Sequence, residues 1–358
     1  MLIGMDREAM LKLYDRLTGL VERLPGGLQK PILNELVPIR EMFLEVRAAR
    51  VMLTGDIGRS AHEFLLEVTG GKPLRAGAGD NGWRYYEMSG MGGVEIMDAR
   101  SDVPEEIVRA GVARFAPDVI VILQEAGSGV ASAQAVAARA ALCDRGVPVA
   151  AVAFGGDRDR ARVSAAIASE RELASRRTAV FNASEPEEFA EGLCAMLPND
   201  AKLEFARLSG AKRAQSQIAR SLLKSFTAVC GVIGVQPIPL ADLPVLTTLQ
   251  TLMVALIIQT TGRKAGPRLV AEFVGALGFN VGAGLLFREG ARALVKVVPF
   301  WGNAVSGMVA GAGTYAIGRA AIAYFIEDAP ITETRKLFRR LLPGKHSAEP
   351  PPPPPLPE

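Results

Sequence analysis

The residues best suited to chemistry lie at positions 55–60, where the sequence reads GDIGRS directly after a short apolar run. A phosphate-binding loop reads GxxxxGK[ST]: its backbone N–H groups wrap the phosphates, its lysine reaches them and its hydroxyl binds Mg²⁺. Gly55, Gly58 and Ser60 keep part of that pattern, but Arg59 replaces the lysine and only two residues separate the glycines. Because a loop this short cannot present the same ring of N–H donors, we expect a degenerate nucleotide site here.

The same segment also has a purely structural interpretation. Ser60 and Glu63 form the pattern S-x-x-E, the capping box that satisfies backbone N–H groups in the first turn of a helix. Asp56 places a negative charge where phosphate oxygens would lie. We favour the structural interpretation over a working nucleotide site, and we expect no catalytic residue.

Two aspartates follow later apolar runs and extend the candidate site. Asp98 lies in VEIMDARSD (94–102), and Asp157 lies in AVAFGGDRD (151–159). Both are also ordinary turn residues, since aspartate favours chain reversals. The candidate nucleotide-binding residues are therefore Gly55, Gly58, Arg59, Ser60, Asp98 and Asp157. We expect none of them to bind a metal ion.

The surrounding chain alternates short apolar runs with helical patterns. Strands that alternate with helices form parallel sheets covered on both faces, so we predict a Rossmann-like P-loop-type α/β domain. Two amphipathic helices, 5–24 and 28–48, precede its first strand. The expected strands are 50–54, 93–98, 118–123, 148–154 and 178–181.

Over residues 45–200, this order of elements and motifs resembles a degenerate Era/TrmE-like small GTPase. VEIMDARSD stands in the place of the DxxG motif, with Ser101 for the glycine. AVAFGGDRD stands in the place of NKxD, with Phe154 and Gly155 for Asn and Lys, and FNAS (181–184) stands in the place of the SA motif. The resemblance implies a P-loop pseudo-GTPase fold.

The resemblance also implies which activities are missing. No threonine occurs between Gly70 and Met97, where the family's switch threonine is expected. A lone aspartate cannot read guanine without its Asn and Lys partners, and hydrolysis needs the threonine and a full loop. We therefore expect no cofactor; GTP and Mg²⁺ would bind only if the degenerate site still works.

Charge divides the chain into two unlike halves. Residues 1–204 carry 24 Lys and Arg against 30 Asp and Glu, a balance of −6, and residues 205–358 carry 17 against 8, a balance of +9. A basic, apolar C-terminal half suggests that it faces lipid phosphate or an acidic partner. Nucleic acid is not expected as a partner, because few aromatics accompany the basic residues and no binding motif is legible.

Two uncharged runs in this half are long enough to cross a hydrocarbon core, which takes ~20 residues. They are Leu243–Gly262, of 20 residues, and Val297–Gly318, of 22. Glycine pairs such as Gly307-x-x-x-Gly311 let helix backbones approach closely. Pro and Gly interruptions cut the runs into shorter pieces, so we favour surface association or a shallow hairpin over full spanning, with a soluble bundle as a third alternative.

The segments IGVQPIPLADLPVLTTLQTLMVALI (233–257) and ARALVKVVPFWGNAVSGMVAGAGTYAIGRAAIAYF (291–325) also carry a resemblance. They resemble the helical C-terminal domain of unknown function that follows Era-like GTPases and occurs in YcjF-type inner-membrane proteins. It implies an α-helical, membrane-associated module next to a nucleotide switch. It implies no catalytic residue.

The C-terminus adds two further segments. The helical pattern 332–342 sets leucines and Phe338 against four basic residues, which suits an anionic lipid surface and equally a solvated face that closes a bundle. The tail has a run of prolines and should be extended and disordered. The expected units are a helical pair (1–48), the α/β domain (49–200), an apolar helical domain (203–330), a basic helix (331–345) and the tail (346–358).

Function follows from these expectations. We expect a membrane-associated pseudo-GTPase scaffold or regulatory protein at the cytoplasmic face of the inner membrane, with a protein partner or a second copy bound through the GTPase-like fold. The alternatives are an active, unorthodox GTPase that drives membrane or assembly changes, and a soluble adaptor. Cys143, Cys194 and Cys230 are scattered in apolar contexts and should be small core residues.

Overall fold

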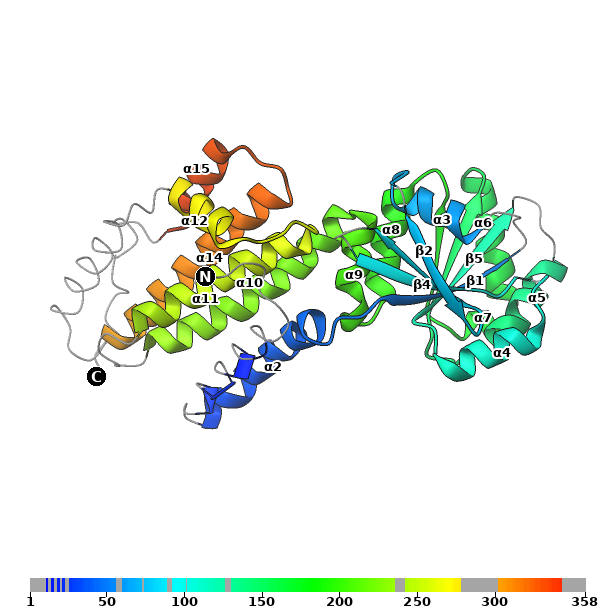
Figure 1. Cartoon of the computed structure of the whole chain (residues 1–358), viewed down its shortest axis with the longest axis horizontal. Helices are drawn as coiled ribbons and strands as arrows, with labels where there is room; N and C mark the ends of the chain where they lie inside the picture. Colours follow the sequence, from blue (N-terminus) through cyan, green and yellow to red (C-terminus); the bar gives the residue numbers. More distant parts are fainter. Residues whose placement is uncertain are drawn as a thin grey trace, which may run out of the picture.

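The structure is a computed structural model that describes residues 11, 14–15, 18–19, 21–22, 26–55, 60–72, 74–88, 92–100, 102–125, 130–235, 242–277 and 302–342. Figure 1 shows an α/β part at one end of the molecule and long helices at the other. A continuous cluster of buried apolar residues extends from one face of the sheet into the helical part.

The α/β part is built on one seven-stranded sheet of order β2-β3-β4-β1-β5-β6-β7. The five strands from β4 to β7 in this order are parallel to one another, and β3 is antiparallel to both β2 and β4. A mostly parallel α/β sheet was expected, and that expectation is confirmed. The bounds are β1 Ala49–Gly55, β2 Arg75–Asp80, β3 Trp83–Met88, β4 Gly92–Asp98, β5 Val119–Glu125, β6 Val149–Phe154 and β7 Thr178–Asn182.

The prediction of five strands, all parallel, is wrong at one edge, because it omits the hairpin β2–β3. Asn81 and Gly82 connect these two strands, and both have positive φ angles, of 47° and 82°. An Asn-Gly pair between two strands is a strong short-range hairpin signal, since both residues accept this backbone geometry. The signal was present in the sequence and was missed.

Helices cover both faces of the sheet, which explains why its central strands are apolar on both faces at most positions. In β5, Val119, Val121 and Leu123 belong to one buried cluster, whereas Ile120 and Ile122 belong to the other. The first face is covered by α3 (Ala61–Val68), α8 (Pro186–Met196) and α9 (Asn199–Ser209). The second is covered by α4 (Glu105–Arg114), which the sequence analysis missed, with α5 (Val130–Ala140), α6 (Asp157–Ser169) and α7 (Arg171–Ala174).

The remaining helices form a bundle. Within it α11 packs against α10 and α14, while α2 packs against α9 and α10. The uncharged residues of α11 are mostly buried there, including Leu252, Met253 and Ile257. Among the described residues, none of the helices is both long enough and apolar enough to cross a membrane. The bounds are α2 Gly26–Phe43, α10 Lys212–Val235, α11 Asp242–Thr260, α12 Pro267–Ala276, α14 Gly302–Phe325 and α15 Ile331–Leu341.

Small residues bring two of these helices close together. A Cβ atom on Gly311 of α14 would lie 3.6 Å from the Cα atom of Gly231 in α10. The close approach expected at Gly311 is therefore present. The sequence also predicts a close approach at Gly278-x-x-x-Gly282, which lies outside the described residues, as do the expected proline break at 236–239 and the tail.

A single helix over 203–233 was expected, and the structure corrects this to α9 and α10. Gly210 ends α9 in the left-handed conformation, with φ 69°, where glycine has no Cβ clash. Two charged residues of α9 then link the parts of the molecule. The Glu204 carboxylate accepts a hydrogen bond from Gly93 N (2.9 Å), and Arg207 Nε donates to Gln259 O of α11 (2.8 Å).

All three cysteines are free and buried, as expected for core residues. Burial raises the pKa of the Cys143 and Cys230 thiols to about 11 and that of Cys194 to about 12. The reactive species is the thiolate, and a raised pKa keeps these thiols protonated. We therefore expect almost no reaction with Ellman's reagent at about pH 8 in the folded protein, and full reaction of all three thiols after denaturation. Fast titration of one thiol in the native protein would contradict this.

Candidate functional site

The candidate residues that the structure describes lie at the carboxyl ends of the parallel strands. Gly55 ends β1 and Asp98 ends β4, and these two parallel strands pair with Leu53 opposite Asp98. Asp157 begins α6, shortly after β6 ends at Phe154. In open α/β sheets, ligands bind beyond the carboxyl ends of the strands where the strand order reverses. Here that place lies at the ends of β1 and β5, between β4 on one side and β6 on the other.

Gly55 is required by the packing of β1 on β5. Its φ angle is 120°, a conformation that strains any residue with a Cβ atom. A Cβ atom at this position would also overlap the backbone carbonyl of Leu123, its partner in β5. The glycine is therefore explained by the sheet alone. Gly58 and Arg59, the next two candidates, lie outside the described residues.

Ser60 caps helix α3. Its Oγ accepts a hydrogen bond from Glu63 N (3.1 Å), and Ser60 N donates to Glu63 Oε2 (2.6 Å). These two bonds complete the capping box that the sequence predicted. The serine hydroxyl, which would bind Mg²⁺ in a working loop, thus has a structural role at the start of the helix.

Asp98 is paired with a cation from its own chain. Arg100 Nε donates to Asp98 Oδ1 (2.8 Å) and Arg100 Nη2 donates to Oδ2 (2.5 Å), so the guanidinium takes both carboxylate oxygens. The backbone N–H of Arg100 reaches Oδ1 as well (3.3 Å). Hydrogen bonding to Asp98 raises the pKa of Arg100, with Asp102 and Glu63 contributing further. The permanently charged guanidinium of Arg100 therefore occupies the two carboxylate oxygens with which Asp98 could otherwise have bound a metal ion.

Asp157 contacts the end of the neighbouring strand. Its Oδ1 lies 3.4 Å from Nδ2 of Asn182, the last residue of β7. Asn182 is buried, and its own Oδ1 is buried without a hydrogen-bond partner. Phe154 lies where the resemblance would require an asparagine, and it offers no amide to a guanine base. The pair Asp157–Asn182 was not anticipated, because the two residues come from different strand–helix units.

These residues do not fit Mg²⁺ and a guanine nucleotide. The carboxylate of Asp98 is neutralised by Arg100, and the hydroxyl of Ser60 caps α3. Across the described part of the chain, no cluster of three His, Cys, Asp or Glu residues could hold a metal ion. The carboxyl ends of these strands therefore resemble a nucleotide site in their position in the fold. The described candidate side chains there, however, are hydrogen-bonded to neighbouring residues of the protein.

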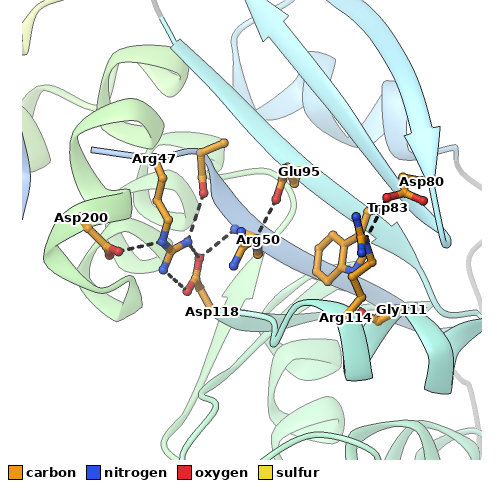
Figure 2. A network of polar contacts seen from close by, with 10 residues as sticks. Arg47, Arg50, Asp80, Trp83, Glu95, Gly111, Arg114, Asp118 and Asp200 are labelled. Carbon is orange, nitrogen blue, oxygen red and sulfur yellow. Dashed lines mark hydrogen bonds and ion pairs between the residues drawn. The ribbon is translucent and has the colours of Figure 1, made fainter. Parts of the chain in front are cut away.

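A polar network centred on Arg47 lies at the amino ends of β1 and β5, and the sequence analysis missed it. Arg47 Nη1 and Nη2 donate to the two carboxylate oxygens of Asp118 (2.7 Å each), and Arg47 Nε donates to Asp200 of α9 (2.7 Å). Figure 2 shows Arg47 between these two aspartates, with Arg50 and Glu95 beside them. The Asp118 side chain also accepts from Arg50 N (2.8 Å) and is only 9% exposed.

This network has a structural role. It ties the segment before β1 to the start of β5 and to α9, and hydrogen bonding to Asp118 raises the pKa of Arg47. Bidentate Arg–carboxylate pairs combine strength with fixed geometry. No local signal in the sequence could have found it, because the partners are 71 and 153 residues apart.

No family model matches this chain, and no curated protein matches it either. What the described residues show around Asp98 is a site at the strand ends whose candidate side chains are hydrogen-bonded within the protein and stabilise the fold.

Proposed function

We propose that this chain is a non-catalytic scaffold or regulatory protein that works at a membrane surface. Its α/β part would be a degenerate small-GTPase-like domain that binds a protein partner or a second copy. The observation that carries this proposal is the bidentate contact of Arg100 with Asp98, because it places a fixed internal cation on the carboxylate that a working site would use for Mg²⁺.

The arrangement of the sheet supports the P-loop-type assignment. The end of β1, the end of β4 and the start of α6 all lie at the carboxyl ends of the strands, around the reversal of strand order, which is where α/β sheets bind ligands. The capping box at Ser60 supports a domain that keeps the fold and has lost the chemistry. An active GTPase is the alternative, and the experiment below separates the two.

The charge of the C-terminal half supports a membrane surface as the place of action. Residues 205–358 have a balance of +9, and anionic lipids attract such segments. In the described residues the apolar side chains of α11 are buried by neighbouring helices. The attraction would therefore be mainly electrostatic for this part of the chain.

Nucleotide binding tests the loss of the site. Calorimetric titration of the full chain with GTP and GDP, with and without Mg²⁺, should show a Kd weaker than about 0.1 mM and no hydrolysis. The physical reason is that Asp98 and Ser60 are already bonded within the protein. Micromolar, Mg²⁺-dependent affinity would overturn the proposal and favour the active GTPase.

The variant Asp98→Asn sharpens this test. If Asp98 bound the metal, the substitution would weaken nucleotide affinity only when Mg²⁺ is present. Because Asp98 pairs with Arg100, we expect instead a lower melting temperature with unchanged nucleotide titrations. Asp80→Asn is a suitable control, since Asp80 forms a more exposed pair with Arg114 at the edge of the sheet, and exposed pairs contribute little to stability.

A further inference from the structure

Helix α15 has two unlike sides, and the structure shows which of them is committed to the protein. Phe338 is 4% exposed and Thr334 is fully buried, and both face the bundle. Arg335 Nε donates to Ala276 O at the end of α12 (2.8 Å), which fixes α15 against that helix. The apolar side of α15 is therefore used for packing and is not available to enter a bilayer.

The other side of α15 carries three exposed cations. Lys336, Arg339 and Arg340 are exposed, and none of them forms an ion pair with a described residue. By contrast, Lys212, Arg220 and Lys224 of α10 are each paired with a carboxylate. Three cations that form no ion pair with the described residues thus lie together on one face of α15.

Two of the nearest carboxylates do not cancel this charge, because they are already paired elsewhere. Glu327 pairs with Arg319 (3.0 Å) and Arg220 (3.7 Å), and Asp328 pairs with Lys212 (2.6 Å). Within α15 itself, Glu333 is the one acidic residue against four basic ones. Lys336 and Arg340 line a groove between α14 and α15, together with the carboxylates Glu327 and Glu333 and with apolar side chains such as Leu337.

We propose that the exposed face of α15 binds anionic phospholipid headgroups through Lys336, Arg339 and Arg340, an inference that rests on the proposed membrane association and names its surface and lipid class. Charge complementarity carries it: three free cations on one rigid helix face match a layer of phosphate groups. Because the apolar side of α15 is packed in the bundle, the helix lies on the headgroups without inserting. Binding is therefore reversed by salt.

Vesicle flotation of the full chain tests this surface. The protein should float with vesicles of phosphatidylcholine and phosphatidylglycerol but not with phosphatidylcholine alone, and ~0.5 M NaCl should release it. The triple variant Lys336→Gln, Arg339→Gln, Arg340→Gln should lower the partition coefficient on the order of a hundredfold. Its melting temperature should stay unchanged, since these side chains make no ion pair within the described protein.

A matched variant controls for net charge. Lys72→Gln, Arg75→Gln, Arg84→Gln removes the same charge from exposed positions of the α/β part and should keep wild-type flotation. Equal flotation of the α15 variant and the wild type would overturn the inference while leaving membrane association standing. Failure of the wild type to float would overturn both. Release by inorganic phosphate, but not by chloride at equal ionic strength, would overturn the inference in favour of a soluble anion.

Discussion

Replacing Arg176 with methionine should lower the free energy of unfolding by about 3–5 kcal/mol, the usual cost of removing one partner from a buried charged network. The side chain of Arg176 is 0% exposed and pairs with Glu172 (2.8 Å). It also donates to four backbone carbonyls near the end of α5, so its loss leaves several buried acceptors without a donor. These carbonyls belong to Ala140, Cys143, Asp144 and Val147.

Urea unfolding followed by circular dichroism measures this effect. Arg171→Met is the matched control, because Arg171 is exposed in the same short helix α7 and its replacement should change stability by less than about 0.5 kcal/mol. Similar midpoints for the two variants would show that the carbonyl cluster at Arg176 is satisfied by water and does not stabilise the fold.

Replacing Gly55 with alanine should destabilise the protein by about 4 kcal/mol or more, a loss large enough to impair folding. Two effects add here. The φ angle of 120° strains a residue with a Cβ atom, and that atom would overlap the carbonyl of Leu123. Because the obstacle is backbone inside the sheet, no side-chain rotation can relieve it.

The melting temperature of the purified variant, or its recovery in inclusion bodies, reports this loss. Gly156→Ala is the control: Gly156 has a negative φ angle of −83°, and nothing lies within 4 Å of a Cβ atom there. A well-folded Gly55→Ala with an unchanged melting temperature would mean that β1 and β5 can separate at this point. Loss of function at Gly55 is therefore expected to report the fold, whether or not a nucleotide binds.

Much of the α/β part could be predicted because its signals are local. The predicted strands 50–54, 118–123 and 148–154 correspond to β1, β5 and β6, since strands covered on both faces are apolar at most positions. The capping box at Ser60 was likewise legible, because its two partners are three residues apart. The hairpin at Asn81-Gly82 and the break at Gly210 had local signals too, and both were missed.

The state of the candidate site could not be predicted in the same way. Asp98 and Arg100 are close in sequence, but their pairing depends on the direction in which the chain leaves β4. The amide of Asn182 meets Asp157 only because β6 and β7 are adjacent. Likewise, the basic pattern at 332–342 suited an anionic lipid surface or a solvated face that closes a bundle, and the burial of Phe338 shows that its apolar side packs in the bundle.

The sequence by itself determined which residues are apolar, where turns can form and how charge divides between the two halves, because these properties depend on composition and short periodicity. Only the tertiary structure decided which charges are neutralised and which stay free. Arg47 reaches Asp118 and Asp200 across 71 and 153 residues, whereas Lys336, Arg339 and Arg340 form no ion pair with the described residues. The physical reason is that an ion pair depends on distances of a few ångströms between side chains, and packing alone sets those distances.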